Sequence, residues 1–107
     1  MEQLTTQQLK QKINDGEDFV LDLYAVWCGP CKVMLNNLLK AKESITLTSE
    51  SKPTYNFYKY DIDSDRDFVM QELGIRSVPT IKIFKEGKEV FSKAGVMSPP
   101  EVISLLN

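Results

Sequence analysis

Hydrophobic residues occur in short runs that predict the strands of a sheet. Residues 19–25 are almost wholly apolar, as expected of a central strand that is buried on both faces. Residues 54–62 alternate polar and apolar side chains and predict a second strand. Residues 80–84 and 89–93 predict two antiparallel strands, because the Lys-Glu-Gly-Lys sequence between them is typical of a hairpin turn. A strand at the N-terminus can cover at most residues 2–4.

Capping residues and hydrophobic spacing predict the helices. Thr5 and Gln8 have the spacing of a capping box, which predicts a helix over residues 6–14. A second helix is expected from Cys28 to about Glu43, because apolar residues recur there at helical spacing. These apolar residues are Val33, Met34, Leu35, Leu38 and Leu39.

Two further helices have recognisable starts. Ser64 and Asp67 form a second potential capping box, for a helix that ends before Gly74. The Ser-Pro-Pro-Glu sequence at 98–101 combines an N-cap, proline in the first turn and a box glutamate, and predicts the last helix. Residues 44–53, rich in serine, threonine and lysine, are expected to form a loop with at most a turn of helix. The alternation of strands and helices predicts an α/β fold, with a central mixed sheet of four to five strands and helices on both faces.

Length and charge narrow the class of protein. The 107 residues suffice for a hydrophobic core, so we expect one domain over residues 1–107 and a monomer. The net charge of −2 carries no polybasic pattern for nucleic acid or an anionic membrane, and no apolar run is long enough to span a bilayer. Residues 1–8 lack the features of a secretory signal, which favours a cytoplasmic location. The absence of histidine excludes histidine acid–base chemistry and histidine metal ligands.

The two cysteines of the chain, Cys28 and Cys31, lie two residues apart and follow the predicted central strand. The thiolate is the reactive form of cysteine, and a Cys-x-x-Cys pair at the start of a helix has a lowered thiol pKa. After a strand in a βαβ context, this spacing indicates a redox motif. A purely stabilising disulfide is the alternative, but so short a ring constrains the unfolded chain little. A structural zinc site needs four cysteine or histidine ligands, so no metal is expected with two.

Asp22 is the one charged residue inside the predicted central strand. An ionised carboxylate among apolar residues is unfavourable unless it is paired, so burial should raise its pKa towards neutrality. A raised pKa suits proton transfer, and we assign Asp22 as the acid/base partner of Cys31. The alternative is an aspartate at an edge of the core whose carboxylate is satisfied by hydrogen bonds.

These features, together with others in the same order, resemble the thioredoxin family. The match includes the Cys-Gly-Pro-Cys motif at 28–31, the aspartate six residues before it, the Gly-Ile-Arg-Ser-Val-Pro-Thr sequence at 74–80, the Phe-Lys-Glu-Gly sequence at 84–87, and Gly95. The resemblance extends from about residue 19 to the C-terminus and implies the thioredoxin fold. Three residues replace the tryptophan, proline and glycine common in the family: Tyr24, Asn36 and Ser77.

The resemblance implies a role for each residue of the motif. Cys28 is the nucleophile that attacks a substrate disulfide, and Cys31 resolves the resulting mixed disulfide. Gly29 and Pro30 are the pair found between the cysteines of reducing members of the family. Trp27 shields the thiols while it remains partly exposed.

Residues outside the motif are expected to form the substrate groove. Val78 and Pro79 are expected to clamp the substrate, with a cis peptide bond between them and strand addition to the backbone of Val78. Ser77 lies beside this groove, and Gly95 lets a substrate backbone approach. By the same resemblance, Lys59 is the charge partner of the buried aspartate.

The sequence is therefore interpreted as a protein disulfide reductase, a thiol–disulfide oxidoreductase that acts on proteins with accessible disulfides. No cofactor should be bound to the chain itself, and the resemblance implies that reducing equivalents come from NADPH through a flavin-containing thioredoxin reductase. A rival interpretation is an accessory subunit in which the thiols are dispensable and residues 36–53 form the binding region. A glutathione-dependent glutaredoxin is a third, disfavoured by Trp27 and the Gly-Pro pair.

Overall fold

The computed structural model describes residues 1–48 and 55–106. Its strands are β1 (Glu2–Gln3), β2 (Phe19–Tyr24), β3 (Asn56–Asp61), β4 (Thr80–Lys85) and β5 (Lys88–Ala94). Its α-helices are α1 (Thr6–Asn14), α2 (Gly29–Thr48), α3 (Arg66–Gln71) and α4 (Pro99–Leu106), and a 3-10 helix, η1, spans Ile62–Ser64. None of the helices within the two described ranges is long and apolar enough to cross a membrane.

The strands form one mixed sheet in the order β1-β3-β2-β4-β5. The central strand β2 pairs in parallel with β3 and antiparallel with β4. At the two edges, β1 runs parallel to β3 and β5 runs antiparallel to β4. Every residue of β2 is buried except the half-buried Tyr24, as a doubly covered central strand requires. The predicted fold class, a mixed sheet with helices on both faces, is confirmed.

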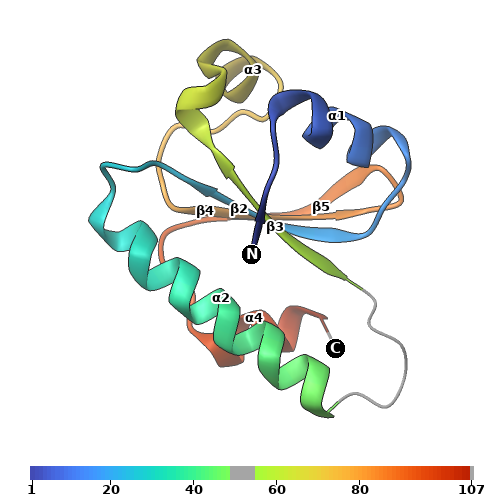
Figure 1. The fold of residues 1–107 in the computed structure, drawn as a ribbon, viewed down its shortest axis with the longest axis vertical. Coiled ribbons are helices and arrows are strands. Elements are labelled where there is room, and N and C mark those ends of the chain that lie inside the picture. Colours follow the sequence, from blue (N-terminus) through green and yellow to red (C-terminus); the bar gives the residue numbers. More distant parts are fainter. Residues whose placement is uncertain (49–54, 107) are drawn as a thin grey trace.

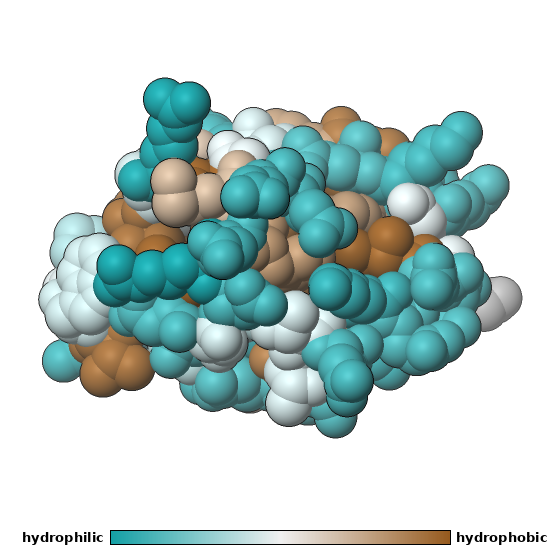
Figure 2. Space-filling view, turned by 90° about the horizontal axis from the view of Figure 1, so that it is seen from above, coloured by the Kyte–Doolittle hydropathy of each residue, from teal (hydrophilic) through white to brown (hydrophobic). Residues whose placement is uncertain are grey.

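Helices cover the sheet from both sides, with α1 and α3 on one face and α2 and α4 on the other (Figure 1). One hydrophobic cluster joins α1 and α3 to the sheet, and a second joins α2 and α4 to it. The largest buried residues of the two clusters include Leu9, Phe19, Leu21, Tyr60, Phe68, Met34, Leu38, Ile81 and Val102. Figure 2 shows the surface of the molecule on the side of the sheet where α1 and α3 lie. This surface is mostly hydrophilic, and hydrophobic residues are visible between the hydrophilic ones.

Capping residues set the ends of three helices. At α1, the Thr5 hydroxyl accepts from the Gln8 N–H and the Gln8 side chain accepts from the Thr5 N–H, so the predicted capping box is confirmed. At α4, Ser98 and Glu101 make the same reciprocal pair. The predicted start of α3 at Ser64 is wrong. Asp65 is the N-cap there, since its carboxylate accepts from the N–H at Phe68, while Ser64 ends the preceding 3-10 helix.

Helix α2 is longer than the sequence pattern predicted. It continues to Thr48 rather than ending near Glu43, so the expected loop is wrong for residues 44–48. Ile45 packs against the cluster under α2 and α4, and this tertiary contact favours helix where composition favours loop. The rest of the expected loop, residues 49–53, lies outside the described residues. The predicted second strand is also shorter, because η1 begins directly after Asp61.

Candidate active site

The two cysteines lie where the central strand β2 leads into helix α2. Cys28 directly precedes Gly29, the first residue of α2, and Cys31 lies one turn into the helix. A disulfide joins them, with their Cα atoms 5.3 Å apart. The backbone N–H at Cys31 donates to Cys28 Sγ over 3.1 Å. The Cys28 sulfur therefore occupies the place of a helix N-cap acceptor, where free N–H groups and the helix dipole stabilise a negative charge.

The disulfide is covered by its surroundings, but its neighbours in the sequence are open to solvent. Cys28 is 5% exposed and Cys31 is 4% exposed, so burial does not separate the nucleophile from the resolving thiol. Their positions do, since Cys28 lies before the helix and Cys31 within it. Gly29 and Pro30 are exposed at the tip of the same turn. A partner can therefore reach the site at the start of α2.

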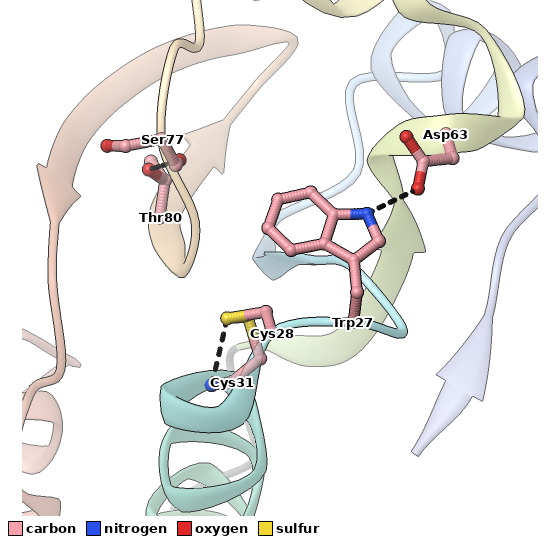
Figure 3. The surroundings of a disulfide bond; sticks show 6 residues. All are labelled: Trp27, Cys28, Cys31, Asp63, Ser77 and Thr80. Atoms are coloured by element: carbon pink, nitrogen blue, oxygen red, sulfur yellow. Dashed lines mark hydrogen bonds between the residues drawn. A yellow bond between two sulfur atoms is a disulfide. The ribbon is translucent and has the colours of Figure 1, made fainter.

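Trp27 lies beside the disulfide and is 67% exposed. Its indole Nε1–H donates to Asp63 Oδ2 over 2.9 Å, as Figure 3 shows. Asp63 also accepts from Arg66, with Arg66 Nη2 at 2.8 Å from Oδ1. The hydrogen bonds from Trp27 and from Arg66 hold the pKa of this carboxyl below its usual value. The exposed indole is thus fixed in orientation by an aspartate that was not predicted as a site residue.

A pocket of about 490 Å³ lies on the Trp27 side of the disulfide. Its lining is largely apolar, with two arginines at its edge. The lining residues include Trp27, Ile62, Met70, Ile75, Arg66 and Arg76. Met70 is 65% exposed, so this pocket offers apolar surface to a partner beside Trp27.

Val78 and Pro79 form a loop that faces the disulfide, and the peptide bond between them is cis. Val78 packs against the cluster that contains both cysteines. The carbonyl of Pro79 accepts from the N–H at Gly95 over 2.8 Å, which brings the next loop alongside. Gly95 is exposed and has φ +98, with nothing within 4 Å of where a Cβ would lie. The expected groove residues are thus brought together around the cysteines.

Ser77 is exposed at the start of this loop and precedes Val78. Its carbonyl accepts from Thr80 Oγ1 over 2.7 Å (Figure 3), a bond that closes the turn around the cis peptide. Thr80 is the first residue of β4, so the turn is attached to the sheet where that strand begins. The Ser77 side chain is left at the surface beside the groove.

Asp22 lies under the disulfide in the middle of β2 and is 1% exposed. Neither of its carboxylate oxygens has a hydrogen-bond partner among the described residues. Burial raises the pKa of Asp22 to about 7, while the positive charge of Lys59 acts in the opposite direction. A carboxyl group with this pKa can accept or release a proton near neutrality.

Lys59 lies opposite Asp22 in the β2–β3 register. Its Nζ is 5.4 Å from the centroid of the Tyr24 ring, in a cation–π arrangement. The Tyr24 hydroxyl donates in turn to Gln3 Oε1 over 2.7 Å. The tyrosine that replaces the family's tryptophan therefore positions the ammonium group near the buried carboxylate.

A smaller pocket of about 230 Å³ connects the buried carboxylate with the sulfurs. It is lined by Asp22, Cys28, Cys31 and Lys59, among others. Its volume exceeds that of a water molecule, and although most of its lining is apolar, Asp22 and Lys59 offer a water polar atoms. Proton transfer between Asp22 and Cys31 through such a water is therefore geometrically open. The catalytic roles assigned to these residues stay predictions.

Across residues 1–48 and 55–106, no group of three or more cysteine, aspartate or glutamate side chains is arranged to hold a metal ion.

Comparison with known proteins places the whole chain in one family. The family model described as Thioredoxin matches residues 1–107. Thioredoxin-1 of Saccharomyces cerevisiae is 36% identical over 91 residues, which cover 85% of this chain and 81% of the yeast protein. The chloroplastic thioredoxin F of Oryza sativa subsp. japonica is 42% identical over 76 residues, or 71% of this chain. The match spans only 37% of that rice protein's length.

Solved structures have the same fold. The oxidised mitochondrial thioredoxin 3 of Saccharomyces cerevisiae superposes with a TM-score of 0.78 at 27% identity, covering 99% of this chain and 92% of the yeast one. A chloroplastic thioredoxin z superposes with a TM-score of 0.81 at 24% identity, covering 99% and 90% of the two chains. At 24% identity, the similarity to thioredoxin z is evidence for the fold alone.

Proposed function

The chain belongs to the thioredoxin family, and on that premise we propose that it acts as a protein disulfide reductase, a thiol–disulfide oxidoreductase with protein substrates. One observation carries the proposal. The two cysteines are joined as a disulfide at the start of α2, beside an exposed tryptophan and the loop that carries Val78 and the cis-proline. The reduced form of this pair is a two-electron donor.

The reaction consists of two exchanges of sulfur–sulfur bonds. The Cys28 thiolate attacks one sulfur of the substrate disulfide, and the other substrate sulfur leaves as a thiolate. The N–H at Cys31, which points at Cys28 Sγ, stabilises the attacking thiolate. The Cys31 sulfur then attacks Cys28 Sγ, which breaks the mixed disulfide and releases the second substrate thiolate. The substrate is reduced by two electrons, and the Cys28–Cys31 pair is oxidised by two.

Asp22 takes the proton of Cys31 in the second exchange. The Cys31 thiol must be deprotonated before it attacks, and the Asp22 carboxylate shares a pocket with it. With its pKa at about 7, Asp22 is a base of suitable strength near neutral pH. The positive charge of Lys59 lowers the pKa of Asp22, so that a fraction of the molecules has this carboxyl group ionised.

The direction of electron flow is part of the proposal. Gly29 and Pro30 place no histidine between the cysteines, and the family resemblance associates this pair with reductants. The oxidised protein must then be reduced again by a second donor. We assign that step to a thioredoxin reductase that draws on NADPH, and the chain itself supplies only the dithiol.

Reduction of insulin tests the proposal against the accessory-subunit alternative. Wild-type protein with dithiothreitol should accelerate precipitation of the insulin B chain, and Cys28→Ser should abolish the acceleration. Addition of NADPH and a purified thioredoxin reductase in place of dithiothreitol tests the assigned donor. Wild-type protein that leaves insulin intact under both conditions would refute the reductase and favour the accessory subunit.

The cytoplasm is the proposed place of action. An electron carrier whose two cysteines both lie in its redox motif depends on a reducing compartment to keep them in the dithiol form. Relatives named for the chloroplast and the mitochondrion make a direct measurement necessary. Subcellular fractionation of cells that express the tagged full-length gene tests it, and enrichment in an organelle fraction would overturn it.

A further inference from the structure

We propose that Asn37 is a positioning residue, which fixes one wall of the substrate groove to the helix that carries the cysteines. The wall is the loop of residues 95–97, between β5 and α4. The inference rests on the proposed function, because it gives Asn37 a part in the binding of protein disulfides.

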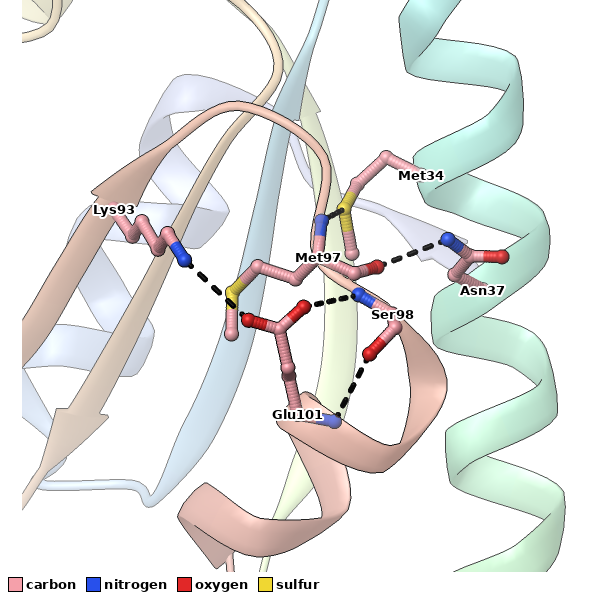
Figure 4. Close-up of polar contacts among 6 residues, drawn as sticks. All are labelled: Met34, Asn37, Lys93, Met97, Ser98 and Glu101. Carbon is pink, nitrogen blue, oxygen red and sulfur yellow. Dashed lines mark hydrogen bonds and ion pairs between the residues drawn. The ribbon is translucent and has the colours of Figure 1, made fainter.

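Three hydrogen bonds hold the backbone of this loop. The N–H at Gly95 donates to the Pro79 carbonyl over 2.8 Å, at the cis-proline side of the groove. The N–H at Met97 donates to Met34 Sδ over 3.1 Å, and Asn37 Nδ2 donates to the Met97 carbonyl over 2.9 Å (Figure 4). Both polar backbone atoms of Met97 are thus held by side chains of α2.

The spacing along α2 ties this loop to the reactive sulfurs. Cys31, Met34 and Asn37 follow one another at intervals of three, so they lie along one side of the helix. Thioether sulfur is a weak hydrogen-bond acceptor, whereas an amide N–H to a carbonyl is an ordinary strong pair. Asn37 is therefore the more important of the two contacts. It fixes the loop at a set position two turns from Cys31.

The loop presents its other side to solvent, next to the cis-proline turn. Gly95 is exposed and Val96 is 42% exposed, whereas Met97 is 2% exposed. If Met97 loses the Asn37 donor, its buried carbonyl is left unsatisfied and the loop gains freedom to reach water. A substrate must then order the loop when it binds, which weakens binding. The exchange chemistry at the sulfurs is untouched, so the maximal rate stays the same.

The chain offers a matched pair of variants for the test. Asn37→Asp keeps the shape of the side chain and removes the N–H donor. Asn36→Asp makes the same chemical change, with the same added charge, at the neighbouring exposed position of α2. Reduced protein is mixed with increasing insulin, and the rate at which its dithiol is oxidised gives the maximal rate and the half-saturating concentration. The small disulfide 5,5′-dithiobis(2-nitrobenzoic acid) serves as a substrate too small to need the loop.

Asn37→Asp should raise the half-saturating insulin concentration about fivefold over wild type and Asn36→Asp, since a net hydrogen bond corresponds to about that factor in binding. The maximal rate and the rate with the small disulfide should stay within about twofold of wild type, a margin well under the tenfold of a major binding contact. Asn37→Leu, which removes the donor without adding a charge, should give the same result and replaces Asn37→Asp if that variant fails to fold.

Two outcomes would overturn the inference, and they can be told apart. If wild type reduces insulin and the Asn37 variants lower the melting temperature without changing half-saturation, Asn37 is only structural. If neither wild type nor Asn36→Asp reduces insulin, the proposed function itself fails and the inference falls with it.

Discussion

Asp22 lies directly opposite Lys59 across the paired strands β2 and β3, yet neither oxygen of its buried carboxylate accepts a hydrogen bond among the described residues. The lysine is held over the ring of Tyr24 instead and acts on Asp22 only through its charge. A buried carboxylate without a hydrogen-bonding partner is destabilising when ionised. The proposed proton transfer between Asp22 and Cys31 would give this carboxyl group a function, and two measurements test it.

The first measurement is stability as a function of pH. Burial raises the pKa of Asp22 from 3.8 to about 7, so between these values the unfolded chain loses this proton before the folded one does. The contribution of Asp22 to stability is therefore fully present below pH 3.8, is lost as the pH rises to about 7, and is constant above. Asp22→Asn removes the buried charge and should stabilise the oxidised protein at pH 8 by on the order of 2–4 kcal/mol.

Urea unfolding at pH 4, 5.5, 7 and 8 measures this gain, which should shrink towards zero at pH 4. Asp67→Asn is a matched control, because it removes one exposed carboxylate from the first turn of α3. A gain at Asp22 that is the same at every pH would contradict the raised pKa.

The second measurement is the rate at which the mixed disulfide is resolved. Asp22→Asn should slow this step by about 10-fold or more near pH 7, within the range that general base catalysis contributes. The wild-type rate should rise with pH through about 7, where the carboxyl group ionises, and the variant should lack this rise. Rapid-mixing kinetics with a preformed mixed disulfide measures it. Equal rates for wild type and variant from pH 6 to 8 would remove Asp22 from the mechanism.

An ion pair between a buried lysine and an exposed glutamate, on the other side of β2, makes a separate prediction. Lys82 in β4 is 4% exposed, and its Nζ lies 2.6 Å from Glu89 Oε1 and 3.2 Å from Ser92 Oγ. Glu89→Ala should destabilise the fold by about 1–2 kcal/mol, between the values for exposed and for buried pairs, because the ammonium of Lys82 is buried but Glu89 is exposed. Lys82→Met should be within about 1 kcal/mol of wild type, because removal of a buried charge offsets loss of the pair.

The exposed pair Lys93–Glu101, with its atoms 3.5 Å apart, provides the control for this prediction. Lys93→Met should leave the urea midpoint unchanged, since exposed ion pairs contribute little. If Glu89→Ala behaved like Lys93→Met, the ammonium of Lys82 would have to be hydrated in solution rather than buried.

The sequence predicted what depends on local patterns and missed what depends on distant contacts. Both ends of α1 were predictable, because its capping box and its stop lie within the same few residues. Residues 44–48 were misread as loop, because the contact of Ile45 with the core is made across the fold. At α3 the Ser64–Asp67 spacing indicated the wrong cap, because Ser64 belongs to the preceding 3-10 helix and Asp65 caps α3.

The residues of the candidate site also fall into those predictable from local patterns and those that depend on distant contacts. The cysteines and Asp22 could be found because a redox motif and a charge inside an apolar strand are visible in the sequence. The partner of Trp27 could not, because Asp63 lies 36 positions away in an acidic stretch that resembles an ordinary helix start. No sequence pattern points to the role of Asn37, since its hydrogen-bond partner is the backbone carbonyl of a residue 60 positions further along the chain.

Trapping of the reaction intermediate tests the central claim most directly. Cys31→Ser retains the nucleophile and removes the resolving thiol, so a mixed disulfide should accumulate when the reduced variant meets insulin. Mass spectrometry of the digested adduct should show Cys28 linked to an insulin cysteine, and Cys28→Ser should trap little. No adduct with Cys31→Ser, or an adduct formed instead through Cys31 in Cys28→Ser, would contradict the account.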